Sequence, residues 1–301
     1  MAQNLTAPDI VARKGGPRIK MITAYDFPLA KIADRAGTDI ILVGDSLANV
    51  VLGFEDTLSV SVDVMVHHTA AVARARPRAL IVGDMPWLSY HTSPEDTVRN
   101  AGRFVREGGA GAVKLEGGRK RLAMIKAVLS AEIPVMGHLG LTPQSVHAMG
   151  GFRVQGKQAD QAYDLISDAK ALEDAGVFAI VLEGVPDVLA ELVTAEVGVP
   201  TIGIGAGAGC DGQVLVIHDL LGLGGGDYLP KFVRQYANLA EDAVAALEAF
   251  YADIESGAFP SAAETYHMPE ESEFILREMS RRRTDQTIAA DDLMADEAME
   301  K

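Results

Sequence analysis

The sequence predicts an α/β protein, a single parallel (β/α)8 barrel (TIM barrel) with a C-terminal helical extension, and three observations support this prediction. Eight short apolar runs, rich in β-branched residues, recur as far as residue 219. Stretches with helical spacing separate most of these runs. The chain of 301 residues is also longer than the about 250 residues that this fold usually needs. Strands and helices that alternate in this way favour a parallel sheet.

The predicted strands follow one another along the barrel part of the chain. In chain order they are residues 18–23, 39–43, 79–83, 111–115, 133–137, 178–182, 199–204 and 214–219. Three copies of one phrase, "DRAGTDIILVGD", "REGGAGAVKLEG" and "EDAGVFAIVLEG", run from a helix end through a strand to an acid. This repetition marks the strand–helix unit of the barrel and no separately folding repeat.

Three stretches with helical spacing begin at Asp63, Ser93 and Ala159. Ser93 is a candidate N-cap because a proline and then two acids follow it. Gly176, after "ALEDA", is a candidate helix stop. A further helical stretch from Phe232 is expected to cap or flank the barrel.

The sequence predicts two regions of different character. Residues 1–260 are expected to form the catalytic barrel domain, and residues 261–301 an acidic, flexible C-terminal tail. The tail holds 11 acids and 5 bases. Its end, "ADDLMADEAMEK", is typical of a solvated segment or a short partner-binding helix.

The composition excludes several classes of protein. The 42 acids and 27 bases give a net charge of −15, which argues against nucleic acid as a partner. The sequence contains no run of about 18 apolar residues, so no membrane span is predicted. The single cysteine, Cys210, excludes an intramolecular disulfide and a cysteine-based zinc site. The first residues lack a secretory signal pattern, so we expect a cytoplasmic protein.

Acidic residues end several of the most apolar predicted strands. Asp45 follows "ILVG", Asp84 follows "LIVG", and Glu116 and Glu183 end "VKLE" and "IVLE". The carboxyl ends of barrel strands converge on one mouth. A single acid there is more often a helix cap or an ion-pair partner, but four like charges on one rim need a cation to stay ionised. Their hard oxygen atoms favour Mg²⁺.

Three further roles follow from position along the strands. Glu183 is expected to act as a proton acceptor, because its strand lies furthest from that of Asp45. Lys114 shares a strand face with Glu116, which raises the alternative of a Schiff base with a carbonyl substrate. His138 ends the fifth strand on the same rim, and we favour a role in orienting substrate over that of a satisfied core histidine.

Two other patterns are not expected to form the sites that they suggest: the histidine pair is interpreted as structural, and a glycine-rich loop after the seventh strand more often lets the backbone approach a ligand closely. Gly207, Gly209 and Gly212 form a G-x-G-x-x-G, but they follow the seventh predicted strand and open no clear helix, so a dinucleotide site is not expected. His67 and His68 are neighbours on a helix and therefore face different directions.

Ten motifs occur in the order of one known family. They are "MITAYD" (21–26), "LVGDSL" (42–47), "HHTAAVAR" (67–74), "VKLEGG" (113–118), "GHLGLTPQSV" (137–146), "GGFRVQGK" (150–157), "LEGVP" (182–186), "IGIGAG" (202–207), "DGQVLVIHDLLG" (211–222) and "PKF" (230–232). In these motifs the chain resembles the ketopantoate hydroxymethyltransferase (3-methyl-2-oxobutanoate hydroxymethyltransferase) family.

The resemblance implies a barrel related to those of phosphoenolpyruvate and ketoacid enzymes. It implies transfer of a one-carbon unit from 5,10-methylenetetrahydrofolate to 3-methyl-2-oxobutanoate, giving 2-dehydropantoate for pantothenate and coenzyme A synthesis. Asp45 and Asp84 would bind Mg²⁺, with Glu116 as a third ligand, direct or through water. Ser46 and Lys114 would hold the ketoacid together with the two aspartates. Glu183 would accept the proton from C3 of the ketoacid. The resemblance also implies a homo-oligomer, often of ten subunits.

Several alternatives remain open beside this interpretation. The chain could be a folate-independent lyase or mutase of the related ketoacid barrels, or a Schiff-base aldolase that uses Lys114. A non-catalytic ketoacid-binding protein is disfavoured, because a binder needs no spare base. The loop 53–60, "GFEDTLSV", also departs from the family pattern at Phe54 and Ser59, near the expected folate contact.

Overall fold

The computed structural model describes residues 4–151, 153–224 and 229–283. The chain forms two compact units, Met1–Ala240 and Glu241–Lys301. The domain boundary expected after residue 260 and the flexibility of the tail stay predictions. The stretch 290–301 lies outside the described residues.

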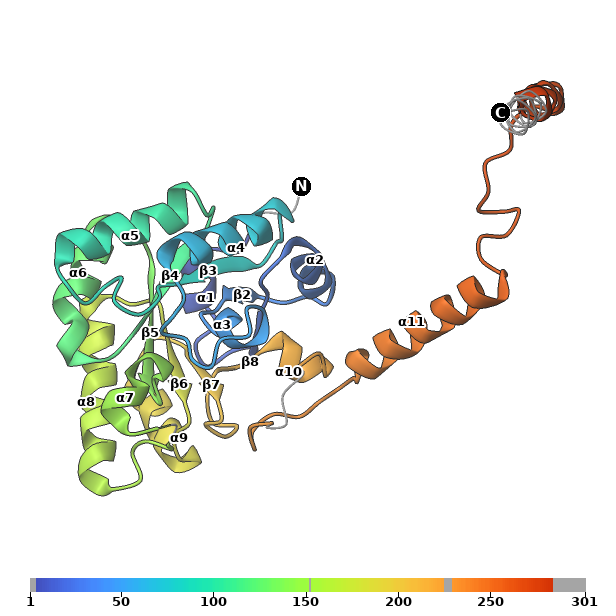
Figure 1. The fold of residues 1–301 in the computed structure, drawn as a ribbon. Coiled ribbons are helices and arrows are strands. Elements are labelled where there is room, and N and C mark those ends of the chain that lie inside the picture. Colours follow the sequence, from blue (N-terminus) through green and yellow to red (C-terminus); the bar gives the residue numbers. More distant parts are fainter. Residues whose placement is uncertain (1–3, 152, 225–228, 284–301) are drawn as a thin grey trace, which may run out of the picture. The chain divides into compact units, whose positions relative to one another are not determined.

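Eight parallel strands close into a barrel in chain order, which confirms the predicted fold (Figure 1). The strands are β1 (Ile19–Thr23), β2 (Ile40–Val43), β3 (Leu80–Asp84), β4 (Ala112–Glu116), β5 (Val135–Gly140), β6 (Ala179–Glu183), β7 (Thr201–Ile204) and β8 (Gly212–Leu215). The last strand pairs with the first, with Ile19 opposite Gly212, and this pairing completes the barrel.

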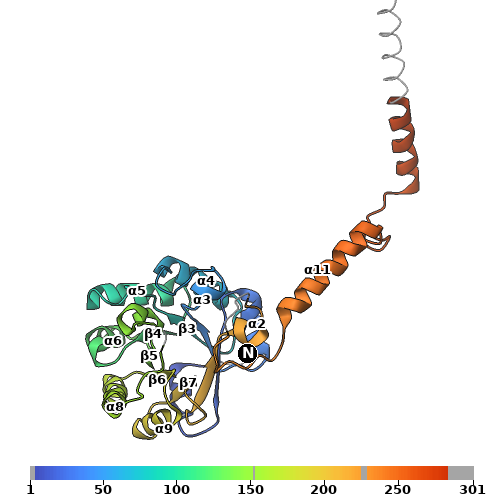
Figure 2. The same cartoon turned by 60° about the horizontal axis from the view of Figure 1, so that its bottom comes forward.

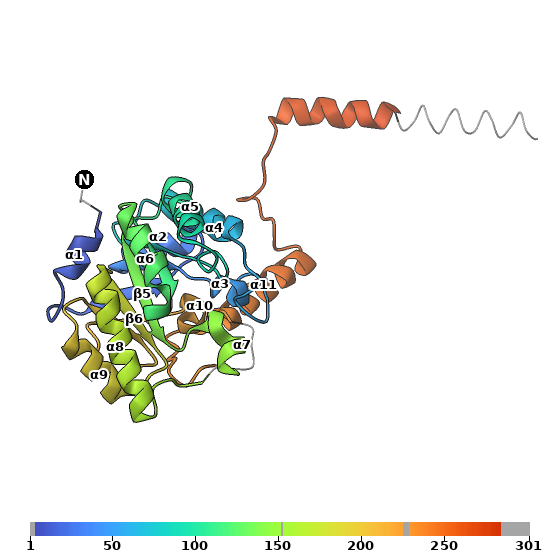
Figure 3. The same cartoon turned by 90° about the vertical axis from the view of Figure 1, so that its left-hand side faces the viewer.

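Helices surround the barrel strands. The α-helices of the first unit are α1 (Ala7–Val11), α2 (Phe27–Arg35), α3 (Leu47–Val50), α4 (Val62–Arg74), α5 (Pro94–Arg106), α6 (Leu122–Ser130), α7 (Val146–Met149), α8 (Ala159–Ala175), α9 (Asp187–Glu196) and α10 (Ile217–Leu221). Helix α11 (Leu239–Ser256) belongs almost wholly to the second unit. Two short 3-10 helices, η1 (Arg119–Arg121) and η2 (Pro143–Ser145), follow β4 and β5. Figure 2 shows α4, α5, α6, α8 and α9 outside the strands. Figure 3 shows α1 at one end of the barrel and α3, α7 and α10 toward the other.

Both faces of the barrel strands are buried. In β2, Ile40 and Leu42 belong to the apolar cluster that fills the barrel interior. Ile41 and Val43 belong to a second cluster, which also contains helix residues and therefore lies between strands and helices. Burial of alternate residues on opposite faces explains why the strands read as nearly continuous apolar runs.

The predicted helix signals are confirmed. The side chain of Ser93 caps α5 by accepting a hydrogen bond from the backbone of Asp96. Gly176 ends α8 in the left-handed conformation, with φ of 100°. Ser93 therefore fixes where the loop after β3 ends, and Gly176 fixes where the loop before β6 begins.

The eighth strand and the C-terminal helix differ from the expectation. Residues 214–219 were expected as a strand, but β8 is Gly212–Leu215 and α10 begins at Ile217. The strand starts earlier because Gly212 pairs with both β1 and β7, and Ile217 is buried in the outer cluster from the helix. The helix expected from Phe232 begins only at Leu239.

The second unit consists of helical segments joined by a non-helical stretch. No residue of α11 is buried, and residues 270–283 form a further helix. None of the helices in the described part of the chain is both long enough and apolar enough to span a membrane.

Asp211 anchors the amino end of the barrel, opposite the strand ends that carry the predicted site. Its Oδ1 accepts a hydrogen bond from the backbone of Gly15 (3.0 Å), and its Oδ2 accepts from Lys14 Nζ (3.0 Å) and the backbone of Thr201 (2.9 Å). Burial opposes ionisation, but the hydrogen bonds from Thr201, Gly15 and Lys14 hold the pKa of Asp211 below its ordinary value. Asp211 therefore ties the segment after α1 to β7.

We predict that Asp211→Asn lowers the free energy of unfolding by about 1–3 kcal/mol near pH 7, because charged hydrogen bonds are lost. A lowered carboxyl pKa stabilises the fold above the pKa of the unfolded chain and stops doing so as pH falls. The difference between wild type and variant should therefore narrow as pH falls below the ordinary value of 3.8.

The measurement is chemical denaturation of both proteins between pH 7 and pH 3. Asp63→Asn is the control, because Asp63 forms an exposed ion pair with Arg103 that contributes little. A difference that stays constant over this pH range contradicts the prediction.

Candidate active site at the carboxyl end of the barrel

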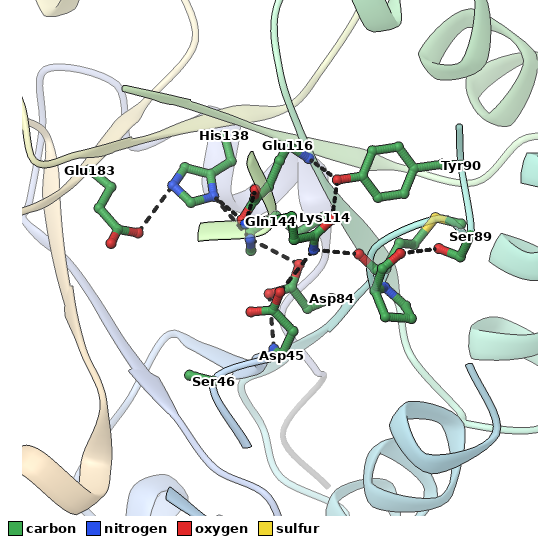
Figure 4. Close-up of polar contacts among 12 residues, drawn as sticks. Asp45, Ser46, Asp84, Ser89, Tyr90, Lys114, Glu116, His138, Gln144 and Glu183 are labelled. Atoms are coloured by element: carbon green, nitrogen blue, oxygen red, sulfur yellow. Dashed lines mark hydrogen bonds and ion pairs between the residues drawn. The ribbon is translucent and has the colours of Figure 1, made fainter. Parts of the chain in front are cut away.

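Polar side chains replace apolar ones where the inward-facing rows reach the carboxyl ends of the strands. In β4, Ala112 lies in the interior cluster, and Lys114 and Glu116 follow on the same face. In β3, Val82 is followed in the same way by Asp84. The inward-facing polar residues at the strand ends are Asp84, Lys114, Glu116, His138 and Glu183 (Figure 4).

Lys114 and Asp84 form a buried ion pair. Their side chains are 4% and 2% exposed, and Nζ lies 2.9 Å from Oδ1. Burial alone would lower the pKa of Lys114, but the charges of Asp84, Glu116 and Asp45 raise it above its ordinary value. Burial raises the pKa of Asp84 to about 7, against the opposing effect of Lys114. The lysine is therefore an ammonium ion, not the neutral amine that a Schiff base requires.

His138 connects the two glutamates of the site. Its Nδ1 lies 3.4 Å from Glu116 Oε1 and 3.1 Å from Lys114 Nζ, and its Nε2 lies 3.2 Å from Glu183 Oε2. Glu116 Oε1 and His138 Nε2 make no hydrogen bond of ordinary geometry, so these two contacts are mainly electrostatic.

The charge of His138 follows from these neighbours. Burial and Lys114 would lower its pKa, but Glu116 and Glu183 raise the pKa to about 9. The two carboxylates therefore favour the protonated ring, whereas the 3.1 Å contact of Nδ1 with the Lys114 ammonium favours a neutral ring that accepts a hydrogen bond there.

The loop after β2 adds Asp45 and Ser46 to the group. Ser46 Oγ lies 2.8 Å from the hydroxyl of Tyr25, and Asp45 Oδ2 accepts a hydrogen bond from Gln144 Nε2 at 2.8 Å. The backbone N–H of Asp45 donates to Asp84 Oδ2 at 3.2 Å. Burial and then the charge of Glu116 raise the pKa of Asp45 to about 6.

All seven residues predicted for the site therefore meet at one end of the barrel. They are Asp45, Ser46, Asp84, Lys114, Glu116, His138 and Glu183. Their individual roles stay predictions. The structure adds two neighbours to which no role was assigned from the sequence, Tyr90 and Gln144. The position of Gln144 just after a strand end was the available signal, whereas nothing in the sequence marked Tyr90.

The charges of the site do not balance. Four acids face one lysine and one histidine, so the acids outnumber the bases by two. Within residues 4–151, 153–224 and 229–283, no three His, Cys, Asp or Glu side chains stand in an arrangement that could hold a metal ion. Mg²⁺ is commonly bound by only one or two carboxylates together with water and substrate oxygens. The paired aspartates therefore fit Mg²⁺ of this open kind, and not a closed protein cage.

The histidine pair and the glycine-rich segment both make contacts within the fold. His68 Nδ1 lies 2.7 Å from the backbone oxygen of Tyr25. The glycine-rich segment after β7 leads into β8 and not into a helix, and Gln213 donates to the backbone oxygen of Gly207 at 2.9 Å.

Comparison with known proteins identifies the family. The sequence model of the ketopantoate hydroxymethyltransferase family matches residues 4–262. The chain belongs to this family. It is 56% identical over 259 residues to 3-methyl-2-oxobutanoate hydroxymethyltransferase of Syntrophomonas wolfei subsp. wolfei, covering 86% of this chain and 94% of that protein. It is 57% identical over 269 residues to the enzyme of the same name from Moorella thermoacetica, covering 88% and 100%. The resemblance predicted from the motifs is confirmed, and the chain is a hydroxymethyltransferase of this family.

Solved structures with the same fold are more distant. 2,3-Dimethylmalate lyase matches with a TM-score of 0.54 and 17% identity over 95% of this chain and 99% of that one. Phosphonopyruvate hydrolase in complex with oxalate and Mg²⁺ matches with a TM-score of 0.54 and 14% identity over 94% and 99%. At this identity the likeness shows the barrel fold alone, so it does not favour the lyase or mutase alternative.

We predict that Lys114→Met lowers the free energy of unfolding by about 3–5 kcal/mol, because it leaves Asp84 buried without its partner. Adding Asp84→Asn should restore a large part of that loss, since the unpaired charge is then removed. Chemical denaturation of the single and double variants near pH 8 measures both effects.

Lys170→Met serves as the control, because Lys170 pairs with Glu196 at the surface and should change stability little. The prediction is contradicted if Asp84→Asn lowers the free energy of unfolding as much in the Lys114→Met background as it does in the wild type. The loss in Lys114→Met would then not come from the unpaired charge of Asp84.

Proposed function

We propose that this chain transfers a hydroxymethyl group from 5,10-methylenetetrahydrofolate to 3-methyl-2-oxobutanoate, with Mg²⁺ as cofactor, in pantothenate and coenzyme A synthesis. The products would be 2-dehydropantoate and tetrahydrofolate, with water supplying the new hydroxyl group. The observation that carries the proposal is a buried acidic cluster with one lysine at the barrel mouth, in a chain of this family. The cytoplasmic location and the homo-oligomer stay predictions.

Mg²⁺ would be held by Asp45 and Asp84, with Glu116 as a third ligand, direct or through water. When bound, the cation would polarise the ketoacid carbonyl and make the adjacent C3 proton more acidic. The excess of acids over bases in the cluster supports a divalent ion at this place. The Mg²⁺ and oxalate named for the phosphonopyruvate hydrolase support it by analogy of fold, because oxalate, like a 2-oxo acid, carries oxygen atoms on two adjacent carbons that can chelate one ion.

The ketoacid would bind beside the two aspartates. The Lys114 ammonium would attract its carboxylate, and the Ser46 hydroxyl, held 2.8 Å from Tyr25, would donate a hydrogen bond to it. Burial of Lys114 strengthens this attraction, because little water competes for the charge. His138 would orient the substrate-facing carboxylate of Glu183 through their 3.2 Å contact.

Glu183 would take the proton from C3 of the ketoacid. It is the one acid of the cluster whose side chain keeps 16% exposure, so it can reach a bound substrate and return the proton to solvent. The carbon that loses the proton would then form a bond to the one-carbon unit of the folate. The loop 53–60 follows α3 near this mouth, and Phe54 is 44% exposed there, available for contact with the folate.

The proposal is tested by an assay of 2-dehydropantoate formation from both substrates, with added Mg²⁺ or with EDTA. We expect turnover that needs the folate, stops with EDTA and returns with Mg²⁺. Turnover of a ketoacid without folate would support the lyase alternative. Borohydride trapping of Lys114 together with indifference to EDTA would support the Schiff-base alternative.

We predict that Glu183→Gln lowers turnover by about 10²–10⁴-fold, the usual contribution of a general base, and leaves ketoacid affinity nearly unchanged. The sharper measurement is exchange of the C3 proton with deuterated solvent, followed by NMR without folate. This exchange isolates proton removal from carbon–carbon bond formation.

Glu191→Gln is the control, because Glu191 is an exposed acid on α9. The control should exchange the C3 proton at the wild-type rate. Wild-type exchange in Glu183→Gln would show that another group is the base.

A further inference from the structure

We propose that Gln144 is a positioning residue that holds the carboxylates of Asp45 and Glu116 ready for the cation, and that Tyr90 fixes the orientation of its amide. The inference rests on the proposed function, because it assumes a divalent cation at this cluster. Neither residue needs to touch the substrate for this role.

Gln144 makes hydrogen bonds to both acids. Its backbone N–H donates to Glu116 Oε2 at 3.1 Å. Its side-chain Nε2 donates to Asp45 Oδ2 at 2.8 Å and to the backbone oxygen of Met85 at 3.0 Å. The residue is 4% exposed, so water does not offer these acceptors an equivalent partner.

The amide of Gln144 has one favourable orientation. Nε2 faces a carboxylate oxygen and a carbonyl oxygen, both acceptors, while Oε1 accepts a hydrogen bond from the Tyr90 hydroxyl. A flipped amide would place Oε1 against two oxygen atoms and lose all three bonds. Tyr90 therefore supports the orientation in which Nε2 meets Asp45.

Tyr90 is itself fixed by the site. Its hydroxyl accepts a hydrogen bond from the backbone N–H of Glu116 at 3.2 Å while donating to Gln144. The residue is fully buried, and the guanidinium of Arg121 lies over its ring, 5.9 Å from the centroid. The hydroxyl thus connects the strand that carries Glu116 to the amide that contacts Asp45.

A tight turn after β5 brings Gln144 into this position. Gly140 has φ of 93°, and a Cβ there would collide with the backbone of Glu183. The backbone of Leu141 then donates to the oxygen of Glu183 at 2.8 Å, and the 3-10 turn η2 directs Gln144 inward. One residue after β5 thereby joins the ends of β2, β3 and β4.

The arrangement has an energetic consequence for binding a cation. The carboxylates of Asp45 and Glu116 repel each other. Without a group that holds them, their side chains would rotate away from one another. Gln144 holds both, so the carboxylates need little rearrangement when the ion arrives. Groups that orient metal ligands in this way typically change metal affinity by about 10–100-fold when removed.

The test is binding of Mn²⁺, as a spectroscopic substitute for Mg²⁺, to the full chain by electron paramagnetic resonance without ketoacid or folate. Gln144→Met removes the amide but keeps length and the backbone N–H toward Glu116. We expect its dissociation constant for Mn²⁺ to rise by about 10–100-fold. The Mn²⁺ concentration needed for half-maximal turnover should rise as well, while turnover at saturating Mn²⁺ falls much less.

Tyr90→Phe should weaken Mn²⁺ binding in the same direction, because the amide loses its anchor. In the Gln144→Met background the same change should have a smaller effect, since the shared contact is already gone. If Gln144→Met fails to fold, the single Tyr90→Phe variant carries the test.

Thr142→Val is the matched control. Thr142 is a buried residue of the same turn, and its hydroxyl contacts only Met149 Sδ, at 4.0 Å, among the contacts found in the described residues. It should bind Mn²⁺ like the wild type, which separates the amide contacts from general disturbance of the turn.

Two outcomes would overturn the inference. Wild-type affinity, within about twofold, in both Gln144→Met and Tyr90→Phe would contradict it while leaving the proposed function intact, given the 10–100-fold expected. Absence of Mn²⁺ binding in the wild type would contradict the metal in the proposed function, and the inference with it.

Discussion

The buried ion pair between Lys114 and Asp84 is the interaction on which the rest of the site depends. The Lys114 ammonium lies 2.9 Å from Asp84 and 3.1 Å from the ring of His138, in a place that is almost closed to water. Carboxylates buried at this density would otherwise protonate, because desolvation and mutual repulsion disfavour their ionised forms. The lysine and the histidine offset only part of that charge, because the acids outnumber them by two. An incomplete balance of this kind prepares a site for a divalent cation, whereas a complete one would only stabilise the fold.

Barrel geometry explains why these groups meet. Residues at two-residue intervals face the interior, and in β3, β4, β5 and β6 the inward row is apolar at its amino end and polar at its last one or two positions. Val82 is followed by Asp84, and Met136 by His138. The apolar part of each row fills the barrel, and the polar part surrounds one mouth. Asp211 secures the opposite end, where it is paired with Lys14. Stability and chemistry are thus separated along the same strands.

The sequence predicted the strand ends well and the cross-contacts poorly. The strands that end at Asp84, Glu116 and Glu183 could be located because each acid follows a buried apolar run. Burying such an acid is costly unless it is paired, hydrogen-bonded or part of a site. The role of Gln144 could not be predicted, because its bonds depend on how a turn after β5 reaches the loops after β2 and β3. The start of β8 was also predicted wrongly. The strand begins at Gly212 because Gly212 pairs with β1 and β7, and its hydrophobicity gives no sign of this. Local pattern determines elements, and only the closed barrel determines which loops touch.

The most direct test of the account is a crystal structure of the enzyme soaked with Mn²⁺ and 3-methyl-2-oxobutanoate, with anomalous diffraction measured at the manganese edge. The account predicts one anomalous peak per chain between Asp45 and Asp84, with the ketoacid oxygens on the same ion. It also predicts Lys114 beside the ketoacid carboxylate, with no covalent bond to the substrate. A peak remote from these aspartates, or a covalent link between Lys114 and the ketoacid, would contradict it.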